Sequence, residues 1–387
     1  MAGATSSLLV AGLVAGCSGS PRAENATPAK NVITVSGATC GAGWQDLSPG
    51  VQTLQIHNTS AVVVEVTLVS SSTGAIYARL EGIGPRTTRA MPVDVGSGSY
   101  AFECFGSSYG YRVSRTVRIP GHVRGGVGIM PVTTPSMNTV ASESEAYVAR
   151  GLGVVARLTT VLAAEIRAGR LAAARAAWLP AHLAWERLGS AYGMFSSFDA
   201  EIDGTPFGLS GGAHSHAFTG FCRLEYGLWH GQSAAELTRP AEELAVAVHE
   251  LKTSWIGMAL PPDQTLGDLA LRTHEILEHA MRFQLSGQAN FGSGTTMATA
   301  AANIDATLAQ LKILHPLLTT RYHDLPALYR WLGRLRQLVN QAKTSHGWIP
   351  ASRLSTTRRE QIDAAAGQAL ELLDPIPVMF EAERPVP

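Results

Sequence analysis

The stretch AYVARGLGVVARLTTVLAAEIRAGR, residues 146–170, places apolar side chains three and four positions apart. Because about 3.6 residues make one helical turn, this spacing predicts an amphipathic helix. The stretch RLAAARAAWLPAHLAWERLGSAYGMF, residues 170–195, repeats the pattern. Further helices are expected near residues 234–253, 266–286, 296–320, 324–345 and 357–374. Consecutive helices without strands predict a helical bundle over residues 141–387.

Residues 31–120 follow a different pattern, with short runs rich in Val, Ile, Thr and aromatic residues. VQTLQIHN at 51–58 and SYAFECFG at 99–106 are two examples, and Gly, Pro, Ser or Asn separates the runs. Such runs predict strands, and many of them with frequent turns predict a Greek-key β-sandwich. The Gly-, Pro- and Thr-rich segment 121–140 is expected to be a linker. The predicted fold class is therefore multidomain, β plus all-α.

The composition excludes one broad class of function. The chain has 387 residues, a formal net charge of +0, 45% hydrophobic residues and 16% charged residues. This balance is typical of globular domains, and it offers no basic surface for a polyanion. Nucleic acid is therefore not an expected partner.

The N-terminus resembles an export signal. LLVAGLVAGC, residues 8–17, is apolar, too short for a permanent membrane span, and ends in small residues before Cys17. It resembles a bacterial lipobox, which implies a signal segment at 1–17, lipid on Cys17 and a polar tether at 18–30. Residues 1–7 lack the Lys or Arg of a usual signal, and a buried apolar strand is the alternative. The expected location is the outer face of the cytoplasmic membrane.

The other cysteines are Cys40, Cys104 and Cys222. An oxidising compartment favours a disulfide between two of them, with Cys40–Cys104 as the expected pair. A blue-copper site is poorly supported, because the run after Cys104 contains neither His nor Met. The remaining alternative is a metal site that adds side chains from the sandwich, namely His57, Glu65 or Glu103.

The helical region contains clusters of residues that commonly bind metals. HLAWE places His182 and Glu186 on one helical face, and GFCRLE does the same for Cys222 and Glu225. Between them lies DAEID, which contains Asp199, Glu201 and Asp203, and a later helix carries HEILEH with Glu275 and Glu278. Bundles build metal sites from such inward-facing groups, although each pair alone is more often a solvated face. Glu186 lies in an apolar stretch, so it is expected to be internal and to need a partner.

Neither of two common peptidase patterns is supported by the sequence. HEILEH has its histidines five positions apart, whereas zinc peptidases of the HExxH type need four. The spacing G-x-S-x-G occurs at residues 106–110 and 208–212, but neither match lies between a predicted strand and a predicted helix, as a nucleophile elbow requires. A peptidase activity is therefore the weaker interpretation.

Taken together, these segments resemble the EfeO-type components of bacterial iron uptake, which have a cupredoxin-like domain followed by an imelysin-like helical domain. The resemblance rests on Cys40, on IHNTSAVVVEVTLV and on the segment that ends at Cys104 in the sandwich. In the bundle it rests on WERLG, FDAEID, HAFTGFCRLEYGLW, HEILEHAMRFQLSG, NFGSGTTMATAAANIDATL and PIPVMFE.

The resemblance implies a non-catalytic protein that captures iron and passes it to an iron permease, with a haem-containing peroxidase as a second partner. It implies a metal site from the residues that match the family's ligand positions, namely Glu186, Asp203, Cys222, Glu225 and Glu275. His182 and Glu278 are possible additions.

The chain departs from the family at two positions. Cys222 stands where the family's G-x-H-x-x-E motif has histidine, and Gly189 stands where the family has a second carboxylate. A thiolate would soften the site and favour Cu(I), Zn(II) or Fe(II), so copper or zinc is an alternative cargo. Cys222 as an inert core residue is equally open, and a metal-free interaction module is the alternative function.

Overall fold

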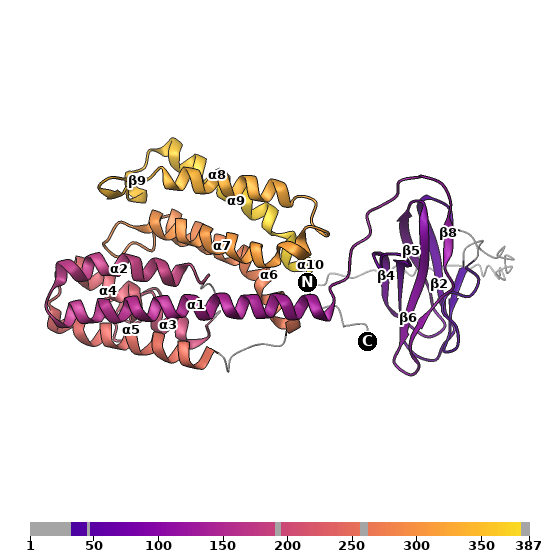
Figure 1. Cartoon of the computed structure of the whole chain (residues 1–387), viewed down its shortest axis with the longest axis horizontal. Helices are drawn as coiled ribbons and strands as arrows, with labels where there is room; N and C mark the ends of the chain where they lie inside the picture. Colours follow the sequence, from indigo (N-terminus) through magenta and orange to yellow (C-terminus); the bar gives the residue numbers. More distant parts are fainter. Residues whose placement is uncertain (1–31, 45–46, 190–194, 256–261, 381–387) are drawn as a thin grey trace, which may run out of the picture. The chain divides into compact units, whose positions relative to one another are not determined.

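The computed structural model describes residues 32–44, 47–189, 195–255 and 262–380. The predicted signal segment 1–17 and tether 18–30 lie outside these residues. The chain divides into two compact units, Met1–Gly128 and Ile129–Pro387. Figure 1 shows the helices and strands of each unit.

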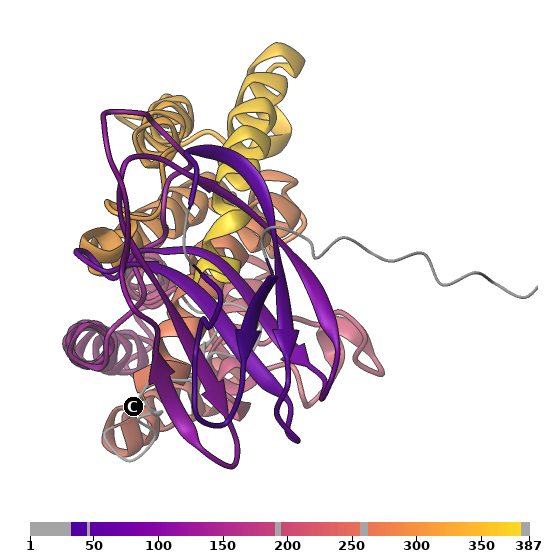
Figure 2. The same ribbon diagram turned by 90° about the vertical axis from the view of Figure 1, so that its right-hand side faces the viewer.

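The first unit is a sandwich of two β-sheets (Figure 1, Figure 2). One sheet has the order β1-β2-β5, and the other has the order β4-β3-β6-β7 with β8 also paired to β6. β1 runs parallel to β2, and the other pairs are antiparallel. The strands are β1 (Val32–Val35), β2 (Gly50–Asn58), β3 (Val64–Ser70), β4 (Ile76–Ile83), β5 (Thr88–Val95), β6 (Gly98–Gly106), β7 (Gly110–Val113) and β8 (Val117–Ile119).

Alternating burial along the strands builds the core of the sandwich. In β5, for example, Met91, Val93 and Val95 are buried and the residues between them are exposed. This two-residue period sends one face of the strand inward and the other to solvent. A disulfide joins Cys40, in the loop after β1, to Cys104 in β6.

The second unit is helical, and it follows the sandwich as the sequence predicts. Its helices are α1 (Thr134–Arg167), α2 (Leu171–Glu186), α3 (Ser197–Asp203), α4 (Gly220–Trp229), α5 (Ala234–Ser254), α6 (Pro262–His279), α7 (Thr296–Leu318), α8 (Leu325–Asn340), α9 (Thr356–Leu373) and α10 (Pro375–Met379). A π-helical turn, Ala280–Leu285, continues α6. The β-sandwich followed by an all-α unit confirms the predicted fold class.

Two local features differ from the expected pattern. α1 already begins at Thr134, inside the segment 121–140 that was expected to be a linker, because Thr133 caps the helix and Pro135 suits its first turn. The helix expected over 324–345 ends at Asn340, and a two-residue strand pair follows, Lys343–Thr344 with Gly347–Trp348.

The helical unit contains two apolar cores. One is formed by α1 to α5, and the other by α6 to α10. α7 lies between α2 and α8 and contacts both, and it also contacts α6 (Figure 1). Polar side chains on α7, including Asn303 and Gln310, are buried beside the end of α2. A polar seam therefore lies between the two cores.

α1 is long and apolar enough to cross a membrane by length and composition alone. In the structure it packs against α2, α5 and α6, and apolar residues such as Leu152, Val155 and Leu162 are buried along one face. Those contacts are typical of the core helix of a folded domain.

Candidate metal centre

α2 brings two polar side chains into the apolar interior. His182 and Glu186 lie one helical turn apart, so they share a face. His182 is 5% exposed and Glu186 only 1%. Burial of an ionisable side chain is costly unless it has a compensating partner. Each of these two buried side chains therefore needs a nearby group of opposite charge.

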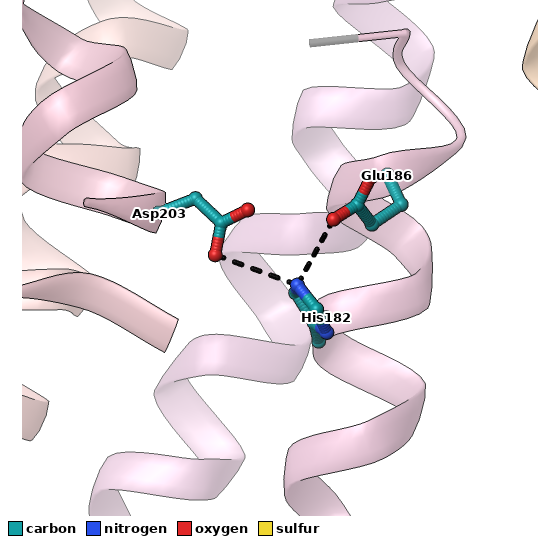
Figure 3. A group of neighbouring side chains, drawn as sticks. All are labelled: His182, Glu186 and Asp203. Atoms are coloured by element: carbon teal, nitrogen blue, oxygen red, sulfur yellow. Dashed lines mark ion pairs between the residues drawn. The ribbon is translucent and has the colours of Figure 1, made fainter. Parts of the chain in front are cut away.

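Asp203, the last residue of α3, meets the α2 pair (Figure 3). The Nε2 atom of His182 lies 3.1 Å from Glu186 Oε1 and 3.4 Å from Asp203 Oδ1. The three residues offer one nitrogen and two oxygen atoms that all lie within 4.8 Å of one another. We call His182, Glu186 and Asp203 the central triad.

The triad has unused hydrogen-bonding capacity. Among the described residues, His182 Nδ1 has no hydrogen-bond partner, and the contacts of Nε2 and of Glu186 Oε1 are ion pairs within the triad. Buried polar atoms in folded proteins are nearly always paired, so such atoms point to a missing ligand or water. Rings of Trp178 and Phe221 flank His182, with centroids 4.8 Å and 5.3 Å away. These rings keep the surroundings apolar and strengthen charge interactions.

Burial and the mutual charges of the triad shift the pKa values of its members in opposite directions. Burial alone would lower the pKa of His182, but the carboxylates of Asp203 and Glu186 raise it to about 10. Burial disfavours the charged form of Glu186, yet His182, His279 and Asn303 hold its pKa below the usual value. Burial raises the pKa of Asp203. Without a bound cation, the imidazolium of His182 is therefore the positive charge that balances Glu186.

Gly220 allows the start of α4 to approach the end of α3, beside the triad. Gly220, the first residue of α4, has φ +77°, and a Cβ there would lie 2.2 Å from the carbonyl oxygen of Ile202. Only glycine permits this approach of α3 and α4. Because the two ends meet, Cys222 Sγ lies 3.3 Å from Asp203 Oδ1. The thiol is thus beside the triad, and it donates to the carboxylate.

Glu225 lies one turn beyond Cys222 and is 2% exposed. Its Oε1 atom accepts three hydrogen bonds, from the backbone N–H of Phe291 (3.1 Å), the backbone N–H of Ser293 (2.9 Å) and the Ser293 hydroxyl (2.6 Å). Burial raises the pKa of Glu225, against the effect of these donors. The carboxylate of Glu225 therefore links α4 to the loop that precedes α7. Glu225 is not part of the central triad.

The predicted carboxylates of α6 lie elsewhere. Glu275 forms an ion pair with Arg272 at 2.9 Å, and the charges that act on it come from α6 itself. Neither Glu275 nor Glu278 belongs to the central triad. The α6 residue whose charge acts on Glu186 is instead His279, directly before the π-helical turn. The i,i+4 pattern in HEILEH contains His279, but spacing alone does not distinguish it from its neighbours.

Asn303 of α7 contacts the triad, and the sequence analysis did not single it out. Its Nδ2 atom donates to Glu186 Oε2 at 2.5 Å, and both residues are buried. A polar residue within the alanine-rich stretch TMATAAANIDATL is the sequence signal that could have identified it. Asn303 orients the carboxylate and leaves Oε1 directed at His182.

The structure also explains the glycine that follows α2. Gly189 has φ +78°, and a Cβ there would lie 2.4 Å from Gln310 Nε2 and 2.6 Å from Ile276 Cδ1. A side chain at this position would collide with both α7 and α6. The chain therefore has no room for a second carboxylate here.

The sandwich residues that formed the alternative metal site have other partners. Cys40 and Cys104 are bonded to each other. Glu65 is paired with Arg79, and His57 Nδ1 lies 2.8 Å from the hydroxyl of Thr88. These contacts do not favour a metal site in the sandwich.

The helical unit matches a known family. The sequence profile of the imelysin family, peptidase family M75, matches residues 145–369, which is more than half of the chain. The chain therefore belongs to the imelysin family. A Yersinia pestis protein named "Iron uptake system component EfeO" is 24% identical over 288 residues, covering 74% of this chain and 73% of that protein. The Escherichia coli K12 protein of the same name is 23% identical and covers 76% of both chains.

A solved structure also aligns with the chain. It is described as an iron-regulated protein A precursor from Parabacteroides distasonis, with 12% sequence identity and a TM-score of 0.47. The alignment covers 64% of this chain and 96% of that chain.

Proposed function

We propose that this protein is a non-catalytic component of an iron uptake system that captures iron at the central triad. The observation that carries the proposal is the convergence of one imidazole and two carboxylates in an apolar interior, with one ligand atom from each within 4.8 Å of the others. Imidazole and carboxylate are suitable ligands for iron. The names of the two relatives support iron as the cargo.

Capture would proceed by exchange of a proton for a cation. In the cation-free protein, the imidazolium of His182 balances the charge of Glu186. An entering cation takes over this role, and the imidazole loses its proton and becomes a ligand. Asp203 is the most exposed member of the triad, with a side chain 20% exposed against 6% for His182 and 2% for Glu186. We expect the cation to enter past Asp203.

Location and partners follow from the same proposal. The lipobox-like segment before Cys17 supports export and anchoring at the outer face of the cytoplasmic membrane. The word "component" in the relatives' names supports a system of several proteins. We propose an iron permease as the receiver of the cargo and a haem-containing peroxidase as a further partner.

The test is a binding titration of the purified full-length chain with Fe²⁺ under anaerobic conditions and with Fe³⁺ as a citrate complex. The variants are Glu186→Gln and Glu65→Gln, which make the same change in the triad and in the sandwich. Glu186→Gln is expected to lower affinity by about 100-fold or more, since the partners of metal ligands alone are worth 10–100-fold. Glu65→Gln serves as the control and is expected to bind as the wild type does.

Three results would overturn all or part of the proposal. Absence of iron binding in the wild type would favour the alternative of a metal-free interaction module that keeps the fold. Equal affinity in wild type and Glu186→Gln would move any bound iron away from the triad. Cleavage of a protein substrate by the purified chain would contradict the non-catalytic role.

A further inference from the structure

Residues 325–359 form a strongly basic segment of the helical unit. They contain seven Lys and Arg residues and no Asp or Glu, although the whole chain has a formal net charge of +0. The helix α1, which is of similar length, contains three basic and three acidic residues. The charge balance of the whole chain, which predicts no basic surface, therefore hides a local excess of positive charge at α8 and the start of α9.

The outer side of α8 is basic. Arg330 and Arg334 lie one helical turn apart, and both are exposed. The opposite side of the helix is buried, with Leu328, Leu332 and Leu335 in the apolar core. α8 packs against α7 and α9, and in Figure 1 it lies at the edge of the helical unit. The two arginines therefore face solvent.

The end of α8 adds two more positive charges. Arg358, in the first turn of α9, donates from Nη2 to Gln341 Oε1 at 3.4 Å, and Gln341 directly follows α8. Lys343 lies two residues further along the chain and is exposed. We call the surface formed by these four cations and the tryptophan of α8 the basic face: Arg330, Trp331, Arg334, Lys343 and Arg358.

The cations of the basic face are not neutralised by acidic side chains. Among the described residues, none of the four takes part in an ion pair. Other arginines are paired: Arg336, also on α8, lies 2.8 Å from Asp305, and Arg167 of α1 lies 2.6 Å from Glu242. Like charges one helical turn apart repel each other. An anionic partner would therefore relieve a repulsion that the fold leaves in place.

Trp331 indicates what kind of anionic partner fits. Its side chain is 38% exposed, next to Arg330 and three positions before Arg334. Tryptophan is enriched where proteins meet membrane headgroups, because its ring is apolar and carries one polar N–H. Basic side chains beside such a ring add attraction to anionic headgroups. An exposed tryptophan among unpaired cations favours a lipid surface over a purely polar polyanion.

We propose that the basic face binds an anionic phospholipid surface and holds the helical unit against the membrane. Its cations are spread over the exposed side of α8 and the start of α9, which suits a layer of many headgroups. A single small anion would need donors that converge on one point. The inference rests on the proposed location at the membrane and not on iron capture, because α8 and α9 contribute no residue to the triad.

The experiment is co-sedimentation of the full-length chain with vesicles, in low and in high salt. One kind of vesicle is phosphatidylcholine alone, and the other is phosphatidylcholine and phosphatidylglycerol in equal amounts. Every protein carries Cys17→Ala, so that no lipid on Cys17 contributes to binding. The variant Arg330→Gln/Arg334→Gln removes two charges from the basic face. The matched control, Arg150→Gln/Arg157→Gln, removes two exposed charges from α1.

The parent chain is expected to bind the anionic vesicles in low salt, to bind them more weakly in high salt and to leave the neutral vesicles unbound. Arg330→Gln/Arg334→Gln is expected to lower the affinity by about 30-fold, since each basic side chain near an anionic surface contributes about fivefold. The α1 control is expected to bind as the parent does. Trp331→Ala is expected to weaken binding in both salt conditions, because the contribution of its ring is not electrostatic. Thermal unfolding checks that each variant folds.

Several outcomes would overturn the inference. They are absence of binding to anionic vesicles, equal binding to both kinds of vesicle, and equal losses in the two double variants. Unchanged affinity in Trp331→Ala would contradict the choice of a lipid surface. Binding of polyglutamate or duplex DNA without binding of anionic vesicles would assign the basic face to another acidic partner and would also overturn it.

Iron titration of the same variants separates this inference from the proposed function. Arg330→Gln/Arg334→Gln is expected to bind iron as the parent does. Failure of vesicle binding with iron binding retained would overturn the lipid surface alone. Vesicle binding without iron binding would overturn iron capture alone.

Discussion

The sandwich and the helical unit treat their ligand-type side chains in opposite ways. In the sandwich these groups are paired with one another, as Cys40 with Cys104 and Glu65 with Arg79. In the helical unit, His182 and Glu186 of α2 converge with Asp203 of α3, and His182 Nδ1 has no hydrogen-bond partner among the described residues. Paired groups hold a fold together, whereas a buried group without a partner is available to a ligand.

The largest expected effect comes from breaking the pairing in the sandwich. The disulfide links residues 64 positions apart, so its loss in Cys40→Ser/Cys104→Ser is expected to destabilise the sandwich by about 4 kcal/mol through the entropy of the unfolded chain. Urea unfolding measures this change. Iron affinity is expected to stay unchanged, because the triad lies in the other unit. Lost iron binding with an intact helical unit would show that the sandwich contributes to the site.

A smaller effect is expected where α3 meets α4. Gly220→Ala would force a Cβ against the carbonyl oxygen of Ile202 and strain a backbone with φ +77°. We expect a loss of about 1–3 kcal/mol in stability and weaker iron binding, because Asp203 and Cys222 move apart.

Gly153→Ala is the matched control for that change. Gly153 lies inside α1 with open space around it, so alanine is expected to stabilise the helix by up to about 1 kcal/mol. Chemical denaturation and iron titration measure both variants. If Gly220→Ala behaved like Gly153→Ala, the close approach of α3 and α4 would not be needed for the site.

The most gradual effect is that of pH on the cation-free protein. Asp203 and Glu186 raise the pKa of His182 to about 10, above the value of 6.5 expected without these partners. A raised pKa means that the folded state holds the proton more tightly than the unfolded state. This contribution is complete below pH 6.5, declines as pH rises and is lost above about pH 10.

Unfolding of the helical unit at several pH values tests this. His182→Gln should flatten the pH dependence of stability between pH 6.5 and about 10. The control is Thr88→Val, which removes the hydroxyl beside His57 in the sandwich and should leave that pH dependence unchanged. An unchanged slope in His182→Gln would assign the dependence to other groups.

The sequence alone was sufficient to predict the order of the two units. Strand-like runs before residue 120 and helical periodicity after residue 140 reflect local rules, because burial of one face requires a two-residue or a 3.6-residue period. The same local rule placed His182 with Glu186 and Cys222 with Glu225. Each pair lies on a single helix, where spacing determines which residues share a face.

Only the tertiary structure decided which pairs meet. In DAEID, Asp199 accepts a hydrogen bond from the backbone N–H of Phe195 and Glu201 is exposed, so Asp203 alone reaches the triad. In HEILEH the charge of His279, directly before the π-helical turn, acts on Glu186, while Glu275 pairs with Arg272. Contacts between helices depend on crossing angles and end positions, which local periodicity does not encode. The residue types came from the sequence, and their convergence came from the packing of α2, α3, α4 and α7.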